Sequence, residues 1–289
     1  MRSSPQSPVT PASAISQAHE FTDADFECIR QLVSQHTGIS LAAHKRCLIY
    51  GRLRKRLQAL GIRQFRDYCE LIRSGNNSEI EQFINSITTN LTYFYREEHH
   101  FDYLANDLLP TLVKNDRTQR RIRIMSAGCS TGEEPYSLAM TLCEVIEDIE
   151  NYDVRILATD LDSNVLRTAA KGVYSIEDVE GLDKQRIHSW FLRGRRGQHG
   201  KIRVSPALRK LITFKQLNLM QPWPMQGPFD IIFCRNVVIY FDKPTQRTLF
   251  ERFANLMQPG AHLFIGHSES LQNITDRFKL IGNSIYQRV

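Results

Sequence analysis

The chain has 289 residues, of which 42% are hydrophobic and 24% are charged. These fractions are close to those of globular proteins and exclude a disordered or collagen-like chain. No apolar run approaches the ~20 residues that span a bilayer, and the Ser- and Pro-rich start lacks the apolar centre of a secretory signal. Six scattered cysteines without a Cys-x-x-Cys pair predict free thiols in a cytoplasmic protein, and the isolated histidines predict no metal site.

The charge balance favours acidic partners. Lys and Arg number 37 against 31 Asp and Glu, which gives a net charge of +6. An excess of this size does not distinguish nucleic acid, a membrane surface or an acidic protein. Its distribution is more informative, because the polar side of one expected helix carries four cations: Lys45, Arg52, Lys55 and Arg56.

The first part of the chain is predicted to be all-helical. Residues 1–20 contain several Pro and Ser and predict a flexible tail. Apolar residues at helical spacing predict helices that begin at Thr22-Asp23, at residue 43 and at residue 65, and Gly38 and Gly61 are expected to end the first two. We expect a helical domain over residues 21–75, followed by a linker over residues 76–98.

A different rhythm begins near residue 121, within an expected domain over residues 99–289. Short apolar strands are predicted at residues 122–125, 154–159, 211–215, 229–234 and 263–266, with helices between several of them. This alternation predicts an α/β fold with a mainly parallel sheet and helices on both faces. The last two β-prone pieces, residues 278–281 and 284–288, predict an antiparallel edge to this mixed sheet.

A Gly-rich, basic stretch interrupts the alternation between the second and third strands. Its β-prone flanks predict a small inserted antiparallel β element at about residues 185–210. A disordered surface loop is the alternative interpretation.

The turn after the first strand runs from Gly128 to Gly132 and does not fit the G-x-G-x-x-G dinucleotide pattern. A pyrophosphate needs a helix amino end free of anions, whereas Glu133 and Glu134 stand at this one. A cofactor with sulfonium and ammonium groups, S-adenosylmethionine (SAM), suits the site better than NAD. A capping box between Thr131 and Glu134 explains the same residues equally well.

Polar residues also follow the second and fourth strands. Asp160 ends the second strand and is well placed to accept hydrogen bonds from both hydroxyls of a ribose. The alternative role, that of helix N-cap, suits Asp162 or Ser163 better. Arg235 and Asn236 break out of an apolar strand where the crevice of such a sheet opens. These features favour a nucleoside-type cofactor.

Several motifs together resemble the CheR-type chemotaxis receptor methyltransferases. The likeness extends in order over residues 21–289 and rests on Thr88-Thr89-Asn90-Leu91-Thr92, Ser130-Thr131-Gly132-Glu133-Glu134-Pro135-Tyr136-Ser137, Ala158-Thr159-Asp160-Leu161-Asp162, Phe233-Cys234-Arg235-Asn236-Val237 and Gly266-His267-Ser268-Glu269-Ser270. It implies an all-helical N-terminal domain, a Rossmann-like SAM-binding domain, and methyl transfer to the γ-carboxylate of glutamates in methyl-accepting chemoreceptors, giving glutamyl methyl esters.

The resemblance also implies site residues and partners. Cofactor contacts are expected at Asn90, Thr92, Arg96, Glu134, Asp160, Asn218, Leu219, Asn236 and Val237. Their donors make Arg96 and Tyr240 our candidates for holding the substrate carboxylate. The basic helix is expected to steer the enzyme to the receptor's helical bundle, with a solvated polar face as the alternative. The β insert is compatible with docking a peptide at the receptor's carboxyl end.

The chemistry explains why no Ser-His-Asp arrangement or metal cluster stands out. A glutamate is ionised at neutral pH, so methyl transfer requires alignment and not a general base. A nucleic-acid methyltransferase is a rival hypothesis, but the Asn-Pro-Pro-aromatic run that holds a flipped base is absent after the fourth strand. A non-catalytic SAM-binding signalling module is another alternative.

Overall fold

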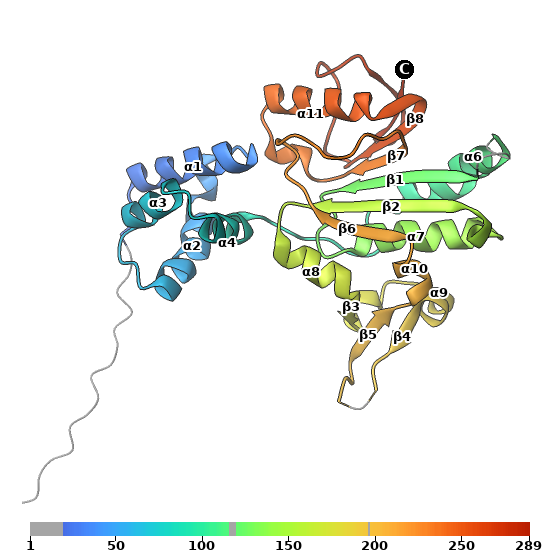
Figure 1. The fold of residues 1–289 in the computed structure, drawn as a ribbon, viewed down its shortest axis with the longest axis horizontal. Helices are drawn as coiled ribbons and strands as arrows, with labels where there is room; N and C mark the ends of the chain where they lie inside the picture. Colours follow the sequence, from blue (N-terminus) through green and yellow to red (C-terminus); the bar gives the residue numbers. More distant parts are fainter. Residues whose placement is uncertain (1–19, 116–119, 196) are drawn as a thin grey trace, which may run out of the picture.

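The computed structural model describes residues 20–115, 120–195 and 197–289, so residues 1–19 of the expected tail lie outside it. A group of helices lies beside a larger α/β part (Figure 1). The helices of the first group are α1 (Asp23–Thr37), η1 (Ala43–Lys45), α2 (Arg46–Leu60), α3 (Phe65–Arg73) and α4 (Asn77–Ile87). Local signals explain the ends of α1, because Thr22 and Asp25 form a capping box and Gly38 ends the helix with φ 75°.

The helical domain extends further than residue 75, where the sequence analysis placed its end. Helix α4 begins after Asn76, whose side chain accepts a hydrogen bond from the backbone N–H of Glu79. Its buried Phe83 and Ile87 join the core formed by α1, α2 and α3. Residues 23–87 therefore form one helical domain, and the segment that leads to the α/β domain is residues 88–98.

The α/β domain contains the expected mixed sheet. Its seven strands lie in the order β6-β2-β1-β7-β8-β10-β9. The first five in this order are parallel, and the last two form the expected antiparallel edge. The strands are β1 (Arg121–Ala127), β2 (Asp153–Asp160), β6 (Ile212–Gln216), β7 (Phe229–Cys234), β8 (Met257–Ile265), β9 (Phe278–Gly282) and β10 (Ile285–Arg288).

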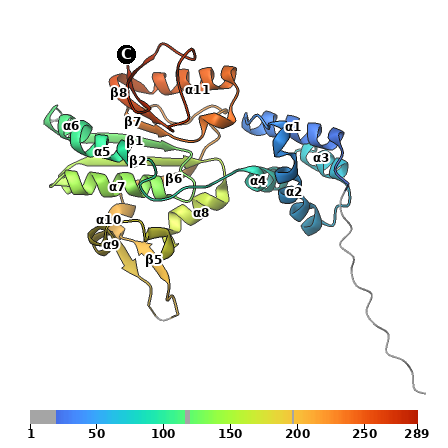
Figure 2. The ribbon, with the colours of Figure 1, turned by 180° about the vertical axis from the view of Figure 1, so that it is seen from behind.

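Helices cover both faces of this sheet, as predicted. Successive residues of β1 point to different cores, Ile124 to one and Met125 to the other. The first core includes residues of α5 (His99–Tyr103) and α7 (Glu133–Val145), and the second includes residues of α11 (Lys243–Asn255). Figure 2 shows α7 and α11 on opposite sides of the strands. The remaining helical elements are η2 (Leu104–Leu108), α6 (Leu109–Asn115), η3 (Ile149–Asn151), α8 (Ser163–Lys171), η4 (Glu177–Val179), α9 (Lys184–Trp190), α10 (Pro206–Arg209) and η5 (Val238–Tyr240).

The expected β insert is present as a small antiparallel sheet that projects from the α/β domain (Figure 1). Its strands are β3 (Val173–Ser175), β4 (Phe191–Arg193) and β5 (Lys201–Val204), in the order β3-β5-β4. The insert starts earlier than expected because β3, which directly follows α8, supplies one edge. None of the helices in the described part of the chain combines the length and apolar character needed to cross a bilayer.

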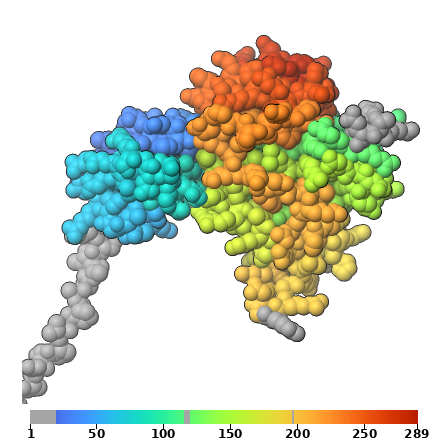
Figure 3. Space-filling view, viewed as in Figure 1, coloured from blue at the N-terminus to red at the C-terminus, as the bar shows by residue number. Residues whose placement is uncertain are grey.

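The helical domain packs directly against the α/β domain (Figure 3). The connector after α1 forms a β-bridge from Ile39 to Phe241, and the backbone N–H of Ser40 donates to the carbonyl of Tyr240 at 2.8 Å. On the other side of this junction, the amide of Asn85 donates to the hydroxyl of Ser163 at 3.0 Å. The junction is thus joined by hydrogen bonds at both ends.

Candidate active site

A cavity of about 470 Å³ lies between the helical domain and the carboxyl ends of β1, β2 and β7. Every residue that the sequence analysis assigned to the cofactor or the substrate lines it: Asn90, Thr92, Arg96, Glu134, Asp160, Asn218, Leu219, Asn236, Val237 and Tyr240. These residues come from segments far apart in the chain. Their convergence follows from the parallel strand order, which places the carboxyl ends of neighbouring strands at one edge.

The turn after β1 approaches the turn after β7 very closely. Gly128 has φ 84°, and a Cβ atom there would lie 2.3 Å from Cγ2 of Val237. The backbone N–H groups of Gly128 and Cys129 donate to the carbonyl of Thr159 at 2.8 and 2.9 Å. Both the conformation and the close approach therefore require glycine at this position.

Glu134 does not form the alternative capping box with Thr131. Helix α7 begins at Gly132 without a side-chain cap. The Glu134 carboxylate instead accepts hydrogen bonds from the hydroxyl of Ser126 at 2.7 Å and from Nη1 of Arg235 at 3.2 Å. Burial raises its pKa, against the effects of Arg235 and Ser126. Glu134 thus lines the cavity from the first turn of α7 and does not cap the helix.

Asp160 faces the cavity with unused acceptor capacity. Its carboxylate oxygens accept the backbone N–H groups of Ser130 at 2.8 Å and of Asp162 at 2.9 Å. Each carboxylate oxygen can accept a second hydrogen bond, and burial raises the pKa of this group. The N-cap role falls to Asp162, as the sequence analysis favoured, because its side chain accepts from the N–H of Asn164.

Asp162 also holds the segment of residues 88–98 against the α/β domain. Its Oδ2 accepts hydrogen bonds from the hydroxyl of Thr88 at 2.7 Å and from the amide of Asn90 at 2.8 Å. The carbonyl of Asn90 in turn accepts from the hydroxyl of Ser130 at 2.8 Å. These bonds place Asn90 beside the turn after β1.

A buried arginine connects this segment to the sheet. The Arg235 guanidinium forms ion pairs with Glu134 at 3.2 Å and with Glu97 at 3.4 Å, and it donates to the carbonyl of Arg96. Burial acts to raise the pKa of Glu97, but the hydrogen bond from His267 and the charge of Arg235 outweigh it and lower the pKa to about 2. Neither Arg235 nor Glu97 was assigned a role from the sequence, although Arg235 was noted as a polar break in an apolar strand.

Arg96 and Tyr240 line the cavity from two different segments, residues 88–98 and the turn after β7. Nη1 of Arg96 donates to the carbonyl of Leu91 at 2.8 Å, and the guanidinium lies 5.9 Å from the ring centre of Tyr93. Tyr240 belongs to the turn after β7, and its carbonyl accepts from Ser40. Both side chains line the cavity from partly exposed positions.

The side chain of Asn218 is engaged with protein backbone. Its amide donates to the carbonyl of His36 at 2.7 Å, and its oxygen accepts from the N–H of Met220 at 2.9 Å. Asn218 therefore ties the segment after β6 to the end of α1 while it lines the cavity.

Two of the four cations expected to face a receptor are held by the protein itself. Arg52 donates to the carbonyls of Ile87 and Thr88 at 2.6 and 2.9 Å. Arg56 forms an ion pair with the buried carboxylate of Glu79. Arg52 and Arg56 therefore do not form a merely solvated polar face, whereas Lys45 and Lys55 are exposed. Docking of a receptor by this helix stays a prediction.

Among the residues that the structure describes, one cluster of possible metal ligands lies beside the cavity. The ligand atoms of Glu97, His99 and His100 lie within 4.8 Å of one another. Glu97, however, already accepts hydrogen bonds from His267 at 2.9 Å and Asn236 at 3.3 Å and is paired with Arg235. Its negative charge is thus neutralised without a metal ion.

These features fit a nucleoside ligand that carries positive groups. Gly128 lets the turn after β1 pack closely on Val237 at the cavity, and Asp160 can accept from two hydroxyls. Glu133 and Glu134 occupy the first turn of α7 and disfavour a phosphate there. SAM combines a ribose with sulfonium and ammonium groups. The fold and the site therefore define a SAM-dependent methyltransferase.

Comparisons with known proteins agree with this class. The family model described as "CheR methyltransferase, SAM binding domain" matches residues 90–287, and the one described as "CheR methyltransferase, all-alpha domain" matches residues 24–88. The Chemotaxis protein methyltransferase of Escherichia coli strain K12 is 43% identical over 92% of this chain and 91% of its own length. Chemotaxis protein methyltransferase 2 of Pseudomonas aeruginosa is 42% identical over 93% and 95%, respectively. The chain belongs to the CheR methyltransferase family.

Proposed function

We propose that this chain transfers the methyl group of SAM to the γ-carboxylate of glutamates in methyl-accepting chemoreceptors, giving glutamyl methyl esters. The observation that carries this proposal is the division of charge across the cavity. Asp160 and Glu134, the latter paired with Arg235, lie on the sheet side, whereas Lys45 and Arg52 of the helical domain line the opposite side. A cationic donor suits the first wall, and an anionic acceptor suits the second.

The donor is expected to follow the sheet edge. Asp160 accepts from the ribose hydroxyls, and Asn218 and Leu219 contact the adenine. The remaining cofactor contacts come from Asn90, Thr92, Arg96, Glu134, Asn236 and Val237. The tethers from Asp162 to Asn90 and from Arg235 to Glu134 support this assignment, because they hold both sides of the site before the donor arrives.

The transfer itself requires alignment. When bound, SAM supplies an electrophilic methyl group on a positively charged sulfur. Arg96 and Tyr240 hold the acceptor carboxylate in line with that methyl group, since each can donate hydrogen bonds from a wall of the cavity. The acceptor is ionised at neutral pH, so its own lone pair attacks and no general base is needed.

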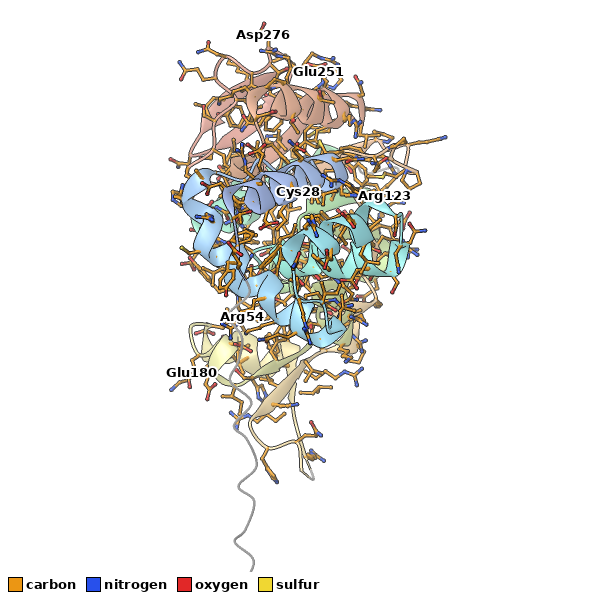
Figure 4. All side chains as sticks on the ribbon, turned by 90° about the vertical axis from the view of Figure 1, so that its left-hand side faces the viewer. Cys28, Arg54, Arg123, Glu180, Glu251 and Asp276 are labelled. Atoms are coloured by element: carbon orange, nitrogen blue, oxygen red, sulfur yellow. The ribbon has the colours of Figure 1, made fainter. Side chains whose placement is uncertain are left out.

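The receptor is expected to dock at the mouth of the cavity. Large apolar side chains are exposed there, among them Leu91, which is 77% exposed, and Leu48, Tyr93 and Ile239. The exposed Lys45 of η1 stands beside them. Apolar residues next to a cation complement an amphipathic helix with acidic groups, such as one from a receptor bundle. Figure 4 looks onto this helical domain, with Arg54 marking α2.

A second contact at the β insert is part of the proposal. Exposed Leu192 on β4 and exposed Lys201 and Arg203 on β5 offer an apolar and a basic surface to a peptide at the receptor's carboxyl end. Leu192→Glu should then slow methylation of receptors that carry this end and leave truncated receptors unaffected. An equal effect on both receptor forms would contradict the peptide contact.

Methyl-labelled SAM and receptor-containing membranes test the proposed reaction. Alkali should release the label, because carboxyl methyl esters hydrolyse readily whereas N-methylated bases persist. Label in nucleic acid would favour the rival methyltransferase, and SAM binding without any transfer would favour a signalling module.

Variants of the two candidate residues test the mechanism. Arg96→Ala and Tyr240→Phe should each lower turnover by at least tenfold. Tyr152→Phe is the matched control, because Tyr152 stacks on Arg120 at the far end of the sheet. Turnover at the wild-type rate in both variants would remove Arg96 and Tyr240 from catalysis.

A further inference from the structure

The motif Gly266-His267-Ser268-Glu269-Ser270 follows β8 and has no role in the reaction as described so far. Glu269 is 8% exposed and does not line the cavity. Its carboxylate nevertheless accepts four backbone N–H groups, from Gly266 at 2.6 Å, Val238 at 2.7 Å, Asn236 at 3.0 Å and Ile239 at 3.1 Å. A buried carboxylate with this number of donors organises the backbone around it.

Three of these four donors belong to the turn after β7, residues 235–241. Asn236 adopts φ 58°, a left-handed conformation that is uncommon for a residue other than glycine. The same turn supplies Asn236, Val237 and Tyr240 to the cavity. The Glu269 carboxylate therefore satisfies the buried N–H groups of a strained turn that carries three site residues.

The approach of the two segments is close enough to exclude a side chain at Gly266. A Cβ atom there would lie 2.6 Å from Nδ2 of Asn236 and 3.0 Å from Oε2 of Glu269. The backbone of Gly266 does not have a positive φ, so space alone requires glycine. Adding one methyl group should thus displace the carboxylate or the turn without removing either.

Asn236 is held from a second direction as well. Its side-chain amide donates to Oε1 of Glu97 at 3.3 Å, and Glu97 also accepts the backbone N–H of His267 at 3.2 Å. Glu97 and Glu269 thus hold Asn236 through its side chain and its backbone, respectively. This arrangement leaves the turn little freedom to reorient.

We propose that Glu269 is a positioning residue for methyl transfer. It fixes the turn after β7 so that Asn236 and Val237 face the donor and Tyr240 faces the acceptor. The inference rests on the proposed function, and it predicts that the affinity for the donor depends on a carboxylate that does not touch the donor.

The test uses Glu269→Gln in the full chain and isothermal titration with S-adenosylhomocysteine. The Gln side chain keeps one acceptor oxygen and turns an NH₂ group toward two backbone N–H groups, so it cannot hold the turn. We expect the Kd to rise at least tenfold and turnover to fall at least tenfold, at a temperature where the variant is folded. Binding with the wild-type Kd would overturn the proposal.

A matched variant separates positioning of the turn from general destabilisation of the protein. Glu79→Gln removes a carboxylate of similar burial from the core of the helical domain, so it should lower the Tm and leave the Kd within twofold of wild type. An equal loss of affinity in Glu79→Gln would refute positioning by Glu269.

If Glu269→Gln fails to fold, Gly266→Ala tests the positioning of the turn, because its Cβ would press on Asn236 as well as on the Glu269 carboxylate. Its control is Gly181→Ala, because Gly181 has open space around its Cβ position and no positive φ. We expect only Gly266→Ala to weaken binding, and equal affinities would overturn the proposal. If wild type binds S-adenosylhomocysteine but methylates no receptor, the proposed function fails while the role of Glu269 is still decided by these affinities.

Discussion

The ionised state of Glu97 should contribute strongly to stability, and its contribution should depend on pH. Interactions with His267 and Arg235 lower its pKa from an ordinary value of 4.5 to about 2, although burial opposes the shift. A shift of this size corresponds to about 3 kcal/mol at ~1.4 kcal/mol per unit. Because the folded-state pKa is the lower one, this stability is present above pH 4.5 and is lost as the pH falls toward 2.

Glu97→Gln mimics the protonated carboxyl group and should remove that contribution. The free energy of unfolding of the variant should be about 3 kcal/mol lower than that of wild type at pH 7, and this difference should fall to about 1 kcal/mol at pH 3. Urea titrations followed by tryptophan fluorescence measure both values, because Trp190 and Trp223 pack against the two cores of the α/β domain. Glu251→Gln, which breaks a half-exposed pair with Arg277, should cost at most ~1 kcal/mol. If the wild-type and Glu97→Gln curves ran parallel from pH 7 to pH 3, the assignment of the low pKa to Glu97 would be refuted.

Three further predictions concern single groups. Arg56→Met leaves the Glu79 carboxylate buried without its cation and should lower the free energy of unfolding by ~3–5 kcal/mol. Slower receptor methylation with unchanged thermal stability would instead favour a docking role for Arg56. Burial and the charge of Arg235 lower the pKa of His100 to about 4. The free energy of unfolding of wild type should therefore fall by up to about 3 kcal/mol between pH 6.5 and pH 4, where the unfolded state binds the extra proton. Urea titrations at several pH values should show a flatter pH dependence for His100→Gln, and an unchanged slope would contradict the assignment. Asp160→Asn should weaken S-adenosylhomocysteine binding at least tenfold by calorimetry, since it removes charge-assisted hydrogen bonds worth ~1.5–3 kcal/mol each, and wild-type affinity would argue against a ribose contact.

The elements themselves were largely predictable from the sequence. Apolar runs rich in Ile, Val and Leu identified all five parallel strands, and the hairpin around Gly282 identified the antiparallel edge. The end of the helical domain was misplaced because residues 74–76 carry strong turn signals. A local turn and a domain boundary look alike in sequence, and only the packing of Phe83 and Ile87 distinguishes them.

The motifs identified residues that line one cavity, but not the partners of the charged residues around it. The sequence places Arg56 on a polar helix side that could face a receptor, because its partner, Glu79, lies 23 residues away on another helix. Arg235 was recognised as unusual, yet its carboxylate partner Glu134 lies 101 residues away. Spacing alone could not decide between a capping box and a cavity wall for Glu134, because that choice depends on Arg235.

The short connector between α1 and α2 belongs to both domains at once. Ile39 pairs with Phe241, and a few residues later the chain enters η1 and α2, which carry Lys45 and Arg52, respectively, to the cavity. The same connector also donates the Ser40 N–H to the carbonyl of Tyr240, so the helical domain is hydrogen-bonded directly to the turn that bears Tyr240. The surface proposed to meet the acceptor and the turn proposed to face the methyl donor are thus joined through one short connector.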